Sequence, residues 1–367
     1  MQLKVIITGG HSTGLGLSDL IREKHPNWQI YYFGRKYSFE NNKVYSFDYK
    51  VVSRQKGIKF IALRPGRWPR TLNGAAFLGL LRIPLGLIQS FYWLSKIRPA
   101  IIFAFGGYVS VPVVFSGWLL KIPIVSHEQT QVVGLATRLN SRFSRKVAVA
   151  FPQLVSRFPS GKAVYTGLPL RKSLNNKDEP GKLETVKELM AKEKKLLIYV
   201  TTGKAGSLAL NKVITEILSK ISEKYLILHQ TGEMSYPSLQ ILAKKNKYYF
   251  PYSFLSGQEQ AWALNNAELV ISRAGANITF ELLKLKRPGL LVPLPNSDQD
   301  EQKKNARWFV SLGGGGMINQ SNLSARSLIK KINQILTNKN KYARALKKVK
   351  IKNGAQDLLL LGEKYIL

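Results

Sequence analysis

Apolar runs alternate with helix-forming stretches in the first half of the chain. The runs are KVIITGG, WQIYYFG, AIIFAFGG and IPIVSHE, at residues 4–10, 28–34, 100–107 and 122–128, and a helical pattern occupies about 14–24. Continuous apolar runs are typical of strands that are covered on both faces. The pattern therefore predicts a parallel β-sheet with helices on each side.

The second half repeats this plan after a polar stretch at 171–182. KLLIYVTTGKAG at 195–206 has the same order of strand, small-residue turn and helix as KVIITGGHSTG at the start. Further strands are expected in YLILHQTG, AELVISRAGA and RPGLLVPLPN, and the chain should close with helices. Two Rossmann-like α/β domains are therefore expected. We place them at 1–166 and 195–340, joined by a hinge at 167–194, with a last helix in 341–367 that packs back on the first.

Composition limits the chemistry that the chain can perform. Its 367 residues exceed what one hydrophobic core usually organises. The absence of cysteine excludes disulfides, thiolate nucleophiles and cysteine-based zinc sites. The four histidines, at 11, 25, 127 and 229, do not form a ligand-like cluster, so metal dependence through histidine is not expected. No cofactor is expected either. The N-terminus leads directly into a strand without the pattern of a signal peptide, which favours the cytoplasm.

The formal charge of +35 requires a polyanionic surrounding. Nucleic acid, anionic lipid headgroups and phosphorylated substrates are the candidates. Nucleic acid is not expected as a partner, because the chain lacks a recognised binding module and interleaved aromatic residues that stack on RNA bases. Part of the charge lies in the lysine-rich segment 337–354, which can equally be a solvated helix face.

Residues 64–98, RPGRWPRTLNGAAFLGLLRIPLGLIQSFYWLSKIR, combine apolar and aromatic side chains with basic ones. Arg82, Pro84 and Gln89 interrupt the segment, which argues against a spanning helix. An interfacial patch on an anionic membrane is predicted instead, and a buried helix pair with a polar edge is the alternative. The basic residues of the segment are Arg64, Arg67, Arg70, Arg82, Lys96 and Arg98.

One turn of the second half has the composition of a nucleotide site. In LVISRAGANITFELL at 269–283, Gly275 and Ala276 are small enough for a diphosphate to approach the backbone at a helix N-terminus. Glu281, inside the following helix, can accept hydrogen bonds from ribose hydroxyls. An ordinary strand-to-helix turn is the alternative.

Polar side chains also follow the next expected strand, and they suit the hydroxyls of a sugar. They are Asp300, Glu301, Gln302 and Asn305. A polar loop and helix start is the alternative. The DQD at 298–300 has the form of a metal-binding motif, which we interpret as chance because two phosphate-type turns are present.

Two strand ends of the first half carry histidines. Gly9, Gly10 and His11 follow the first strand, and His127 and Glu128 end a later one. The carboxyl ends of parallel strands meet at one edge of a sheet, so the two histidines can face the same cavity. Each can act in proton transfer or be structural.

Seven motifs in order resemble the MurG-type glycosyltransferases, which transfer N-acetylglucosamine from UDP-GlcNAc to lipid I, the undecaprenyl-diphosphate-linked muramyl pentapeptide. They are TGGH at 8–11, FGGYVS at 105–110, HEQ with GLATRLN within 127–140, AFP at 150–152, TGLPLR at 166–171, RAGANITFE at 273–281 and DEQKKNA at 300–306. The resemblance covers most of the chain. It implies a GT-B type fold, in which two Rossmann-like domains face a cleft and the C-terminal helix returns to the first domain.

The resemblance also implies the residues of the site. On the acceptor side these are Thr8, Gly9, Gly10, His11, Tyr108, His127, Glu128 and Thr130. On the donor side they are Arg171 in the hinge, Lys204, Arg273, Gly275, Ala276, Asn277 and Ile278 around the diphosphate, Glu281 at the ribose, and Glu301 and Gln302 at the GlcNAc hydroxyls. Arg273 would support its loop.

The implied reaction is an inverting displacement at the anomeric carbon without a metal ion. His11 is the first choice for the base, with His127 and Glu128 behind it. The partners would be UDP-GlcNAc, the undecaprenyl-linked acceptor and an anionic membrane surface, which places the protein on the cytoplasmic face of the cell membrane as a peripheral protein.

Three positions depart from the family pattern. Thr130 and Leu168 stand where the family usually has Asn, and Lys204 stands where a phosphate-contacting Ser is expected. The first glycine-rich loop also lacks a Pro and is one residue shorter. A UDP-sugar transferase acting on another lipid-linked acceptor, or a non-catalytic membrane-bound homologue, is therefore the alternative.

Overall fold

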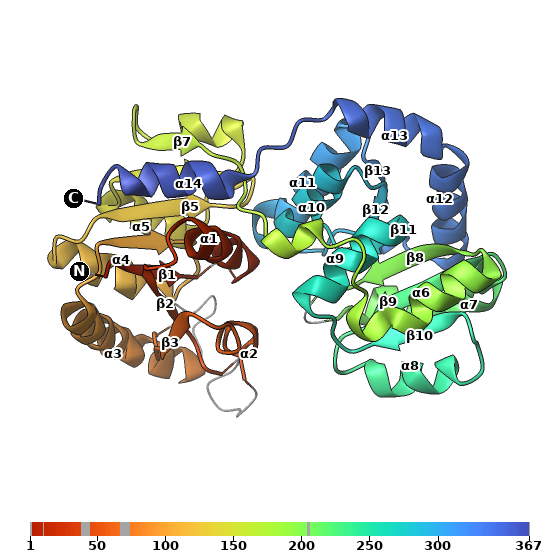
Figure 1. The fold of residues 1–367 in the computed structure, drawn as a ribbon, viewed down its shortest axis with the longest axis horizontal. Coiled ribbons are helices and arrows are strands. Elements are labelled where there is room, and N and C mark those ends of the chain that lie inside the picture. The colour runs from red at the N-terminus through yellow and green to blue at the C-terminus, as the bar shows by residue number, and fades with distance from the viewer. Residues whose placement is uncertain (1, 10, 38–44, 67–73, 204–205, 367) are drawn as a thin grey trace. The chain divides into compact units, whose positions relative to one another are not determined.

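The computed structural model describes all residues except 1, 10, 38–44, 67–73, 204–205 and 367, with the backbone alone at 11–12, 47 and 74–82. The chain forms two compact units, Met1–Lys172 together with Lys352–Leu367, and Ser173–Ile351. Each unit contains one parallel β-sheet with helices packed on it (Figure 1). The predicted fold class of two parallel-sheet α/β domains is confirmed.

The first unit has a seven-stranded parallel sheet in the order β3-β2-β1-β4-β5-β6-β7. Its strands are β1 (Lys4–Thr8), β2 (Gln29–Gly34), β3 (Ile58–Ala62), β4 (Ile101–Ala104), β5 (Ile124–Glu128), β6 (Lys146–Val149) and β7 (Ala163–Tyr165). Its helices are α1 (His11–Lys24), α2 (Phe47–Val52), α3 (Gly74–Ile97), α4 (Ser110–Leu119), α5 (Leu135–Phe143) and α14 (Gly354–Glu363), with a 3₁₀ helix at Pro152–Arg157.

Both faces of this sheet are buried. Val5 and Ile7 of β1 belong to a hydrophobic cluster with α1 and α14, whereas Ile6 belongs to a second cluster with α3 and α4. Neighbouring residues of one strand point to opposite faces, so a strand that is covered on both sides must be apolar at every position. This burial explains the continuous apolar runs.

The last helix, α14, belongs to the first unit, where it packs beside α1 (Figure 1). Its N-cap, Asn353, accepts the backbone N–H of Leu170 at 3.1 Å. His25, directly after α1, lies 2.6 Å from Glu363 near the end of α14. The C-terminal helix thus returns to the first unit, although residues 341–351 of the predicted range 341–367 belong to the second unit.

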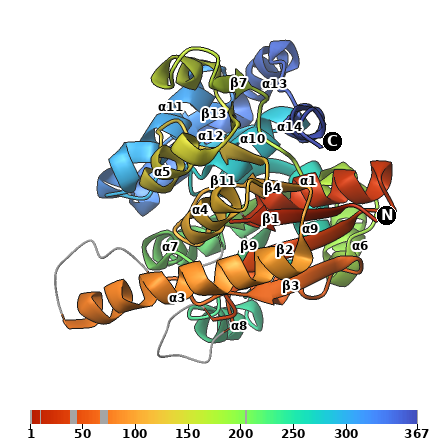
Figure 2. The same cartoon turned by 90° about the vertical axis from the view of Figure 1, so that its left-hand side faces the viewer.

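Most of the segment predicted to lie on a membrane forms one helix, α3, which lies beside α4 (Figure 2). Pro84 lies inside α3. Within the described residues, none of the helices has both the length and the apolar character needed to cross a bilayer. Arg67 and Arg70 lie outside the described residues, and the side chain of Arg82 is not described.

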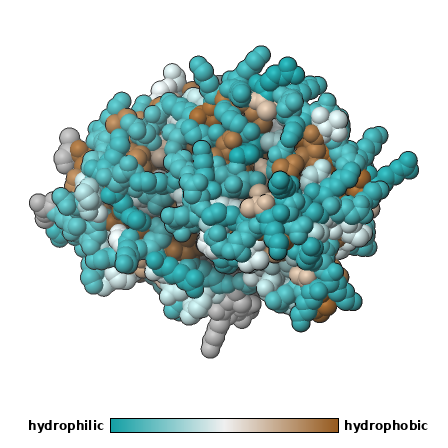
Figure 3. All heavy atoms as spheres, turned by 45° about the vertical axis from the view of Figure 1, so that its right-hand side comes forward, coloured by the Kyte–Doolittle hydropathy of each residue, from teal (hydrophilic) through white to brown (hydrophobic). Residues whose placement is uncertain are grey.

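Large hydrophobic side chains are exposed on α3 and at the end of α4. On α3 they are Leu85, Ile88, Phe91 and Tyr92, and near the end of α4 they are Trp118 and Leu119. Hydrophilic residues cover most of the face shown in Figure 3, where the hydrophobic areas are small.

The second unit has a six-stranded parallel sheet in the order β10-β9-β8-β11-β12-β13. Its strands are β8 (Leu196–Thr201), β9 (Tyr225–Gln230), β10 (Tyr249–Tyr252), β11 (Ala267–Ser272), β12 (Gly289–Leu291) and β13 (Gly315–Met317). Its helices are α6 (Glu184–Glu193), α7 (Leu208–Ser222), α8 (Tyr236–Ala243), α9 (Gly257–Asn266), α10 (Ala276–Leu285), α11 (Glu301–Ser311), α12 (Ala325–Thr337) and α13 (Lys339–Lys348). Short 3₁₀ helices lie at Lys172–Asn175, Gly181–Leu183, Asp298–Asp300 and Gln320–Asn322.

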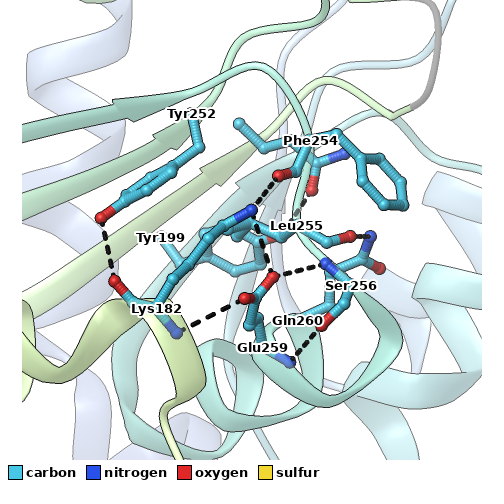
Figure 4. Close-up of polar contacts among 9 residues, drawn as sticks. Lys182, Tyr199, Tyr252, Phe254, Leu255, Ser256, Glu259 and Gln260 are labelled. Carbon is cyan, nitrogen blue, oxygen red and sulfur yellow. Dashed lines mark hydrogen bonds and ion pairs between the residues drawn. The ribbon is translucent and has the colours of Figure 1, made fainter.

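Residues 173–183 are bonded to α9 of the second unit. Lys182 donates to Phe254 O at 2.7 Å and lies 3.3 Å from the carboxylate of Glu259, which forms a capping box with Ser256 (Figure 4). Asn265 donates to Leu174 O at 2.9 Å. This part of the expected hinge is therefore held along the second unit.

Candidate active site

Arg273 joins four turns at the carboxyl end of the second sheet. Its Nη2 donates to Ser207 Oγ, at the N-cap of α7, and to Gln320 Oε1, both at 2.6 Å, and its Nη1 donates to Val292 O at 3.2 Å. Burial lowers the pKa of this guanidinium. Its partners among the described residues are neutral oxygens, so its positive charge is uncompensated there. Such a position suits an anionic ligand.

The N-terminus of α10 lies directly after Arg273. Its N-cap is Gly275, which has no side chain with which to cap the first backbone N–H groups. A Cβ built on Gly275 would meet no heavy atom within 4 Å, so the space in front of the turn is open. The N–H groups and the dipole of a helix N-terminus together favour a negative charge at this point.

Gln302, in the first turn of α11, is bonded to the same turn. Its Oε1 accepts the backbone N–H of Ala274 at 3.3 Å and that of Leu294 at 2.9 Å. Asn305, one turn later, donates to Ala274 O at 3.1 Å. The Nε2 of Gln302 has no hydrogen-bond partner among the described residues, and it can therefore donate to a hydroxyl of a ligand.

The structure brings most of the predicted donor residues of the second unit together. Asn277 and Ile278 lie half-buried in the first turn of α10, and Glu281 is buried in the same helix. Glu301 accepts a long hydrogen bond of 3.4 Å from Asn305. Lys204 lies outside the described residues.

The DQD sequence forms a 3₁₀ turn before α11, in which Gln299 and Asp300 have left-handed backbone conformations. Over the residues whose side chains are described, no three His, Asp or Glu side chains come close enough to hold a metal ion.

In the first unit, the turn after β1 is pressed against the turn after β4. Gly9 has a φ of +72°, and a Cβ there would lie 2.1 Å from Gly106 O, so this position requires glycine. Thr8 donates its hydroxyl to Phe33 O at 3.2 Å, and Tyr32 donates to Gly9 O at 3.0 Å. Gly10 lies outside the described residues.

Glu128 organises the loop after β5. Its Oε1 accepts the backbone N–H of Thr130 at 3.1 Å and the Thr130 hydroxyl at 2.9 Å, and its Oε2 accepts the N–H of Gly134, the N-cap of α5, at 3.0 Å. The carboxylate is almost fully buried. A carboxylate held by three donors of its own loop is suited to fixing that loop and the start of α5.

His127 is buried beside Phe105, and its Nε2 lies 3.0 Å from Gly167 O. Because a carbonyl only accepts hydrogen bonds, Nε2 carries the proton and Nδ1 is the free acceptor. Nδ1 is buried and has no partner among the described residues. Burial lowers the pKa of His127 to about 4, so the ring is neutral at pH 7.

Three further residues were predicted, Tyr108, Arg171 and His11. Tyr108 has the guanidinium of Arg35 5.0 Å from the centre of its ring. Arg171 is half-buried in the first unit, near Asp19 of α1, whose pKa burial raises against the opposing effect of the basic groups around it. His11 begins α1, but its side chain is not described.

Comparisons with known proteins relate both units to one family. Residues 8–149 match the glycosyltransferase family 28 N-terminal domain, and residues 197–359 match the glycosyltransferase family 28 C-terminal domain. The UDP-N-acetylglucosamine–N-acetylmuramyl-(pentapeptide) pyrophosphoryl-undecaprenol N-acetylglucosamine transferase of Clostridium botulinum strain Loch Maree is 31% identical over 366 residues, which are 99% of each chain. The chain belongs to glycosyltransferase family 28.

A second family 28 relative, the transferase of the same name from Clostridium tetani, is 30% identical and covers 100% of this chain and 99% of its own. The crystal structure of Acinetobacter baumannii MurG has a TM-score of 0.68, 21% sequence identity and 99% coverage of both chains, which shows the shared fold. The resemblance to the MurG-type enzymes is confirmed.

Several residues of this family 28 site were not predicted from the sequence. Ser207 and Gln320 bind Arg273 from turns that follow other strands. Gly134 donates its backbone N–H to the second carboxylate oxygen of Glu128. The small residues of TTGKAGS point to the first of these turns, but no sequence pattern points to Gln320.

Proposed function

We propose that this family 28 glycosyltransferase transfers N-acetylglucosamine from UDP-GlcNAc to lipid I and forms lipid II for peptidoglycan synthesis. Two relatives at 30–31% identity over nearly the whole chain are named for this reaction. The donor half of the proposal rests on the N-terminus of α10 next to Arg273, where the N-cap Gly275 has no side chain and open space in front of it.

The second unit would bind the nucleotide sugar. The diphosphate would lie at the N-terminus of α10 near Gly275 and Asn277, with Glu281 at the ribose and Gln302 at the hydroxyls of GlcNAc. Negative charge grows on the diphosphate as UDP leaves. Helix N–H groups and a desolvated guanidinium stabilise such charge in place before the reaction starts. The transfer would therefore proceed without a metal ion.

The first unit would hold the acceptor and the base. Direct attack of the acceptor hydroxyl on the anomeric carbon inverts its configuration and requires a proton acceptor. Glu128 is engaged by its own loop, and His127 has its free nitrogen buried. We therefore keep His11 as the proposed base and give Glu128 and His127 the role of shaping the acceptor side.

The exposed hydrophobic residues of α3 and α4 would lie on the membrane that contains the acceptor. Leu85, Ile88 and Tyr92 are three and four residues apart, so they share one face of α3. Lys96 lies 5.8 Å from the ring of Tyr92 and adds a positive charge at the end of the helix. Aromatic residues at the headgroup level and nearby cations are typical of peripheral binding to anionic bilayers.

A second candidate function is transfer to another lipid-linked acceptor. Thr130 replaces the Asn of the family pattern, and its hydroxyl is bonded to Glu128 and to Val132 O, at 2.9 and 2.6 Å. An acceptor that normally binds an Asn amide would lose that contact.

The test is transfer of radiolabelled GlcNAc to lipid I and to a panel of other undecaprenyl-linked acceptors, with and without EDTA. The proposal expects lipid I to be preferred, EDTA to have no effect, and His11→Ala to reduce kcat at least about 100-fold. Preference for another acceptor would support the second candidate, and absence of transfer to every acceptor would support a non-catalytic homologue.

A further inference from the structure

His229, near the end of β9, is completely buried between α7 and β10 and has polar partners on both sides. Its Nε2 lies 3.1 Å from Asn211 Oδ1, and its Nδ1 lies 2.9 Å from the hydroxyl of Tyr249. Asn211, in the first turn of α7, in turn donates its amide to Thr231 O at 2.9 Å. These contacts form a chain of three hydrogen bonds through the interior of the second unit.

The directions of these bonds follow from the last of them. Thr231 O can only accept, so Asn211 presents Nδ2 to it and Oδ1 to His229. His229 must then donate from Nε2, and its Nδ1 accepts from Tyr249. Burial lowers the pKa of His229 to about 3, so the ring stays neutral and the directions do not change at any pH where the protein would work.

The chain of hydrogen bonds ends at Thr231 O, which lies against the glycine turn that precedes α7. Gly206 has a φ of +77°, and a Cβ there would lie 2.7 Å from Thr231 O. The position of Thr231 therefore limits where Gly206 and the following N-cap, Ser207, can lie. Ser207 is also the residue that Arg273 binds.

Gln230 holds the other end of the same turn. Its Oε1 accepts from Tyr199 at 3.1 Å, and its Nε2 donates to Gly203 O at 3.4 Å. Thr202 donates its hydroxyl to Gln230 O at 2.8 Å. Consecutive residues of β9 thus fix the described parts of the turn on both sides of 204 and 205.

We propose that His229 and Asn211 are positioning residues of the donor site, which set Gly206 and Ser207 at the N-terminus of α7 for the diphosphate of the nucleotide sugar. The inference rests on the proposed function. Neither side chain needs to touch the ligand. Backbone N–H groups stabilise a diphosphate only when they are held in place before it binds. A buried polar chain adds little stability over an apolar core of the same shape, but it specifies one arrangement.

The test compares His229→Leu, His229→Gln and Asn211→Asp with the wild-type chain. Gln can still accept from Tyr249 and donate to Asn211, whereas Leu can do neither. In Asn211→Asp, the new carboxylate would keep an oxygen toward His229 and lose the N–H toward Thr231 O. Asn265→Asp is the matched control. Asn265 is buried to a similar degree, and its amide donates to Leu174 O and Asn176 O. It lies just before the amino end of β11, whereas the donor site lies at the carboxyl ends of the strands.

The measurements are UDP affinity by calorimetry, KM for UDP-GlcNAc, KM for lipid I, kcat and Tm. H229L and N211D are expected to raise the donor KM and the Kd for UDP about tenfold, with the lipid I KM and kcat within about twofold. H229Q should recover most of this loss. N265D should lower Tm without changing the donor KM.

Unchanged UDP binding in N211D, or an equal loss in N265D, would overturn the inference. If the wild-type chain binds UDP but does not use lipid I, the proposed function fails, and the inference is decided by UDP affinity alone. If the wild-type chain does not bind UDP, the inference falls as well. N211D changes neither size nor shape, so it decides the matter if H229L does not fold.

Discussion

Arg273 donates a hydrogen bond to Ser207 at 2.6 Å and so joins the turn after β11 to the N-terminus of α7. The same guanidinium binds Gln320 and Val292 O. A lysine would keep the charge but has no planar fork to reach these partners together. We expect Arg273→Lys to raise the KM for UDP-GlcNAc at least about tenfold, with a smaller effect on the KM for lipid I. Steady-state kinetics with each substrate varied in turn measure both.

Arg287 offers the control for this substitution. It is also half-buried, burial likewise lowers its pKa, and it donates to Asn265 O and Ala267 O at the start of β11. Arg287→Lys should lower Tm and leave the donor KM unchanged. An equal rise of the KM for UDP-GlcNAc in both variants would show that Arg273 acts only through the stability of the fold.

A substitution at Glu128 distinguishes a positioning role of this residue from a catalytic role. In Glu128→Gln, an NH2 group replaces one of the two carboxylate oxygens. It cannot accept a hydrogen bond from the backbone N–H of Thr130 or Gly134, so this loop should loosen. We expect the KM for lipid I to rise about tenfold, while the acid limb of the kcat–pH profile keeps its midpoint. Disappearance of that limb, with an unchanged lipid I KM, would instead identify Glu128 as the base.

Acid should destabilise the protein through two buried histidines. Burial lowers the pKa of His127 to about 4 and that of His229 to about 3, from 6.5 in the unfolded chain. Between these values the unfolded chain binds protons that the folded chain does not, so the free energy of unfolding falls as the pH drops below 6.5. The loss at pH 5 should be about 2 kcal/mol for each histidine.

Urea unfolding at pH 7.5 and pH 5 measures this loss. The two imidazole rings together cause a loss of unfolding free energy between pH 7.5 and pH 5. H229Q and His127→Gln should each remove about half of that loss, because glutamine does not titrate. His25→Gln keeps both buried rings and should keep their contribution. An unchanged pH dependence in both variants would mean that the rings are not buried in the neutral form.

The strands and the division into two α/β domains could be predicted because strands buried on both faces are continuous apolar runs, such as KVIIT in β1. The strand in RPGLLVPLPN is only Gly289–Leu291, since Pro cannot donate in a ladder. The side-chain contacts of the site were harder to predict. Arg273 finds partners 19, 47 and 66 residues away, and only the sheet order brings those turns together.

The glycine turns show the same limit. The sequence places Gly9 at the end of a strand, and only the structure shows that Gly106 O lies against it. His229 was counted only as an isolated histidine, because its partners are on a helix and on another strand. Motif spacing predicts which turns bind a ligand, whereas the residues that hold those turns depend on packing that the local sequence does not contain.

The membrane surface gives the last prediction. Ile88 and Tyr92 are 67% and 56% exposed on one face of α3, and removing such side chains from water is what binds a peripheral protein to a bilayer. Ile88→Glu with Tyr92→Glu should cost about 3 kcal/mol or more of membrane binding, a loss of over 100-fold in partition, because two apolar side chains that would enter the bilayer are replaced by charges that an anionic surface repels. Flotation with phosphatidylglycerol vesicles measures it.

Ile241 of α8 is the matched control for this pair, since it is 60% exposed and lies in the second unit. Ile241→Glu should leave flotation unchanged. The double variant should also turn over a water-soluble lipid I analogue at the wild-type rate while losing activity on lipid I in vesicles, since the charges act only on the membrane encounter. Full flotation of the double variant would place the membrane contact elsewhere on the protein, and slow turnover of the soluble analogue would mean that α3 shapes the acceptor site directly.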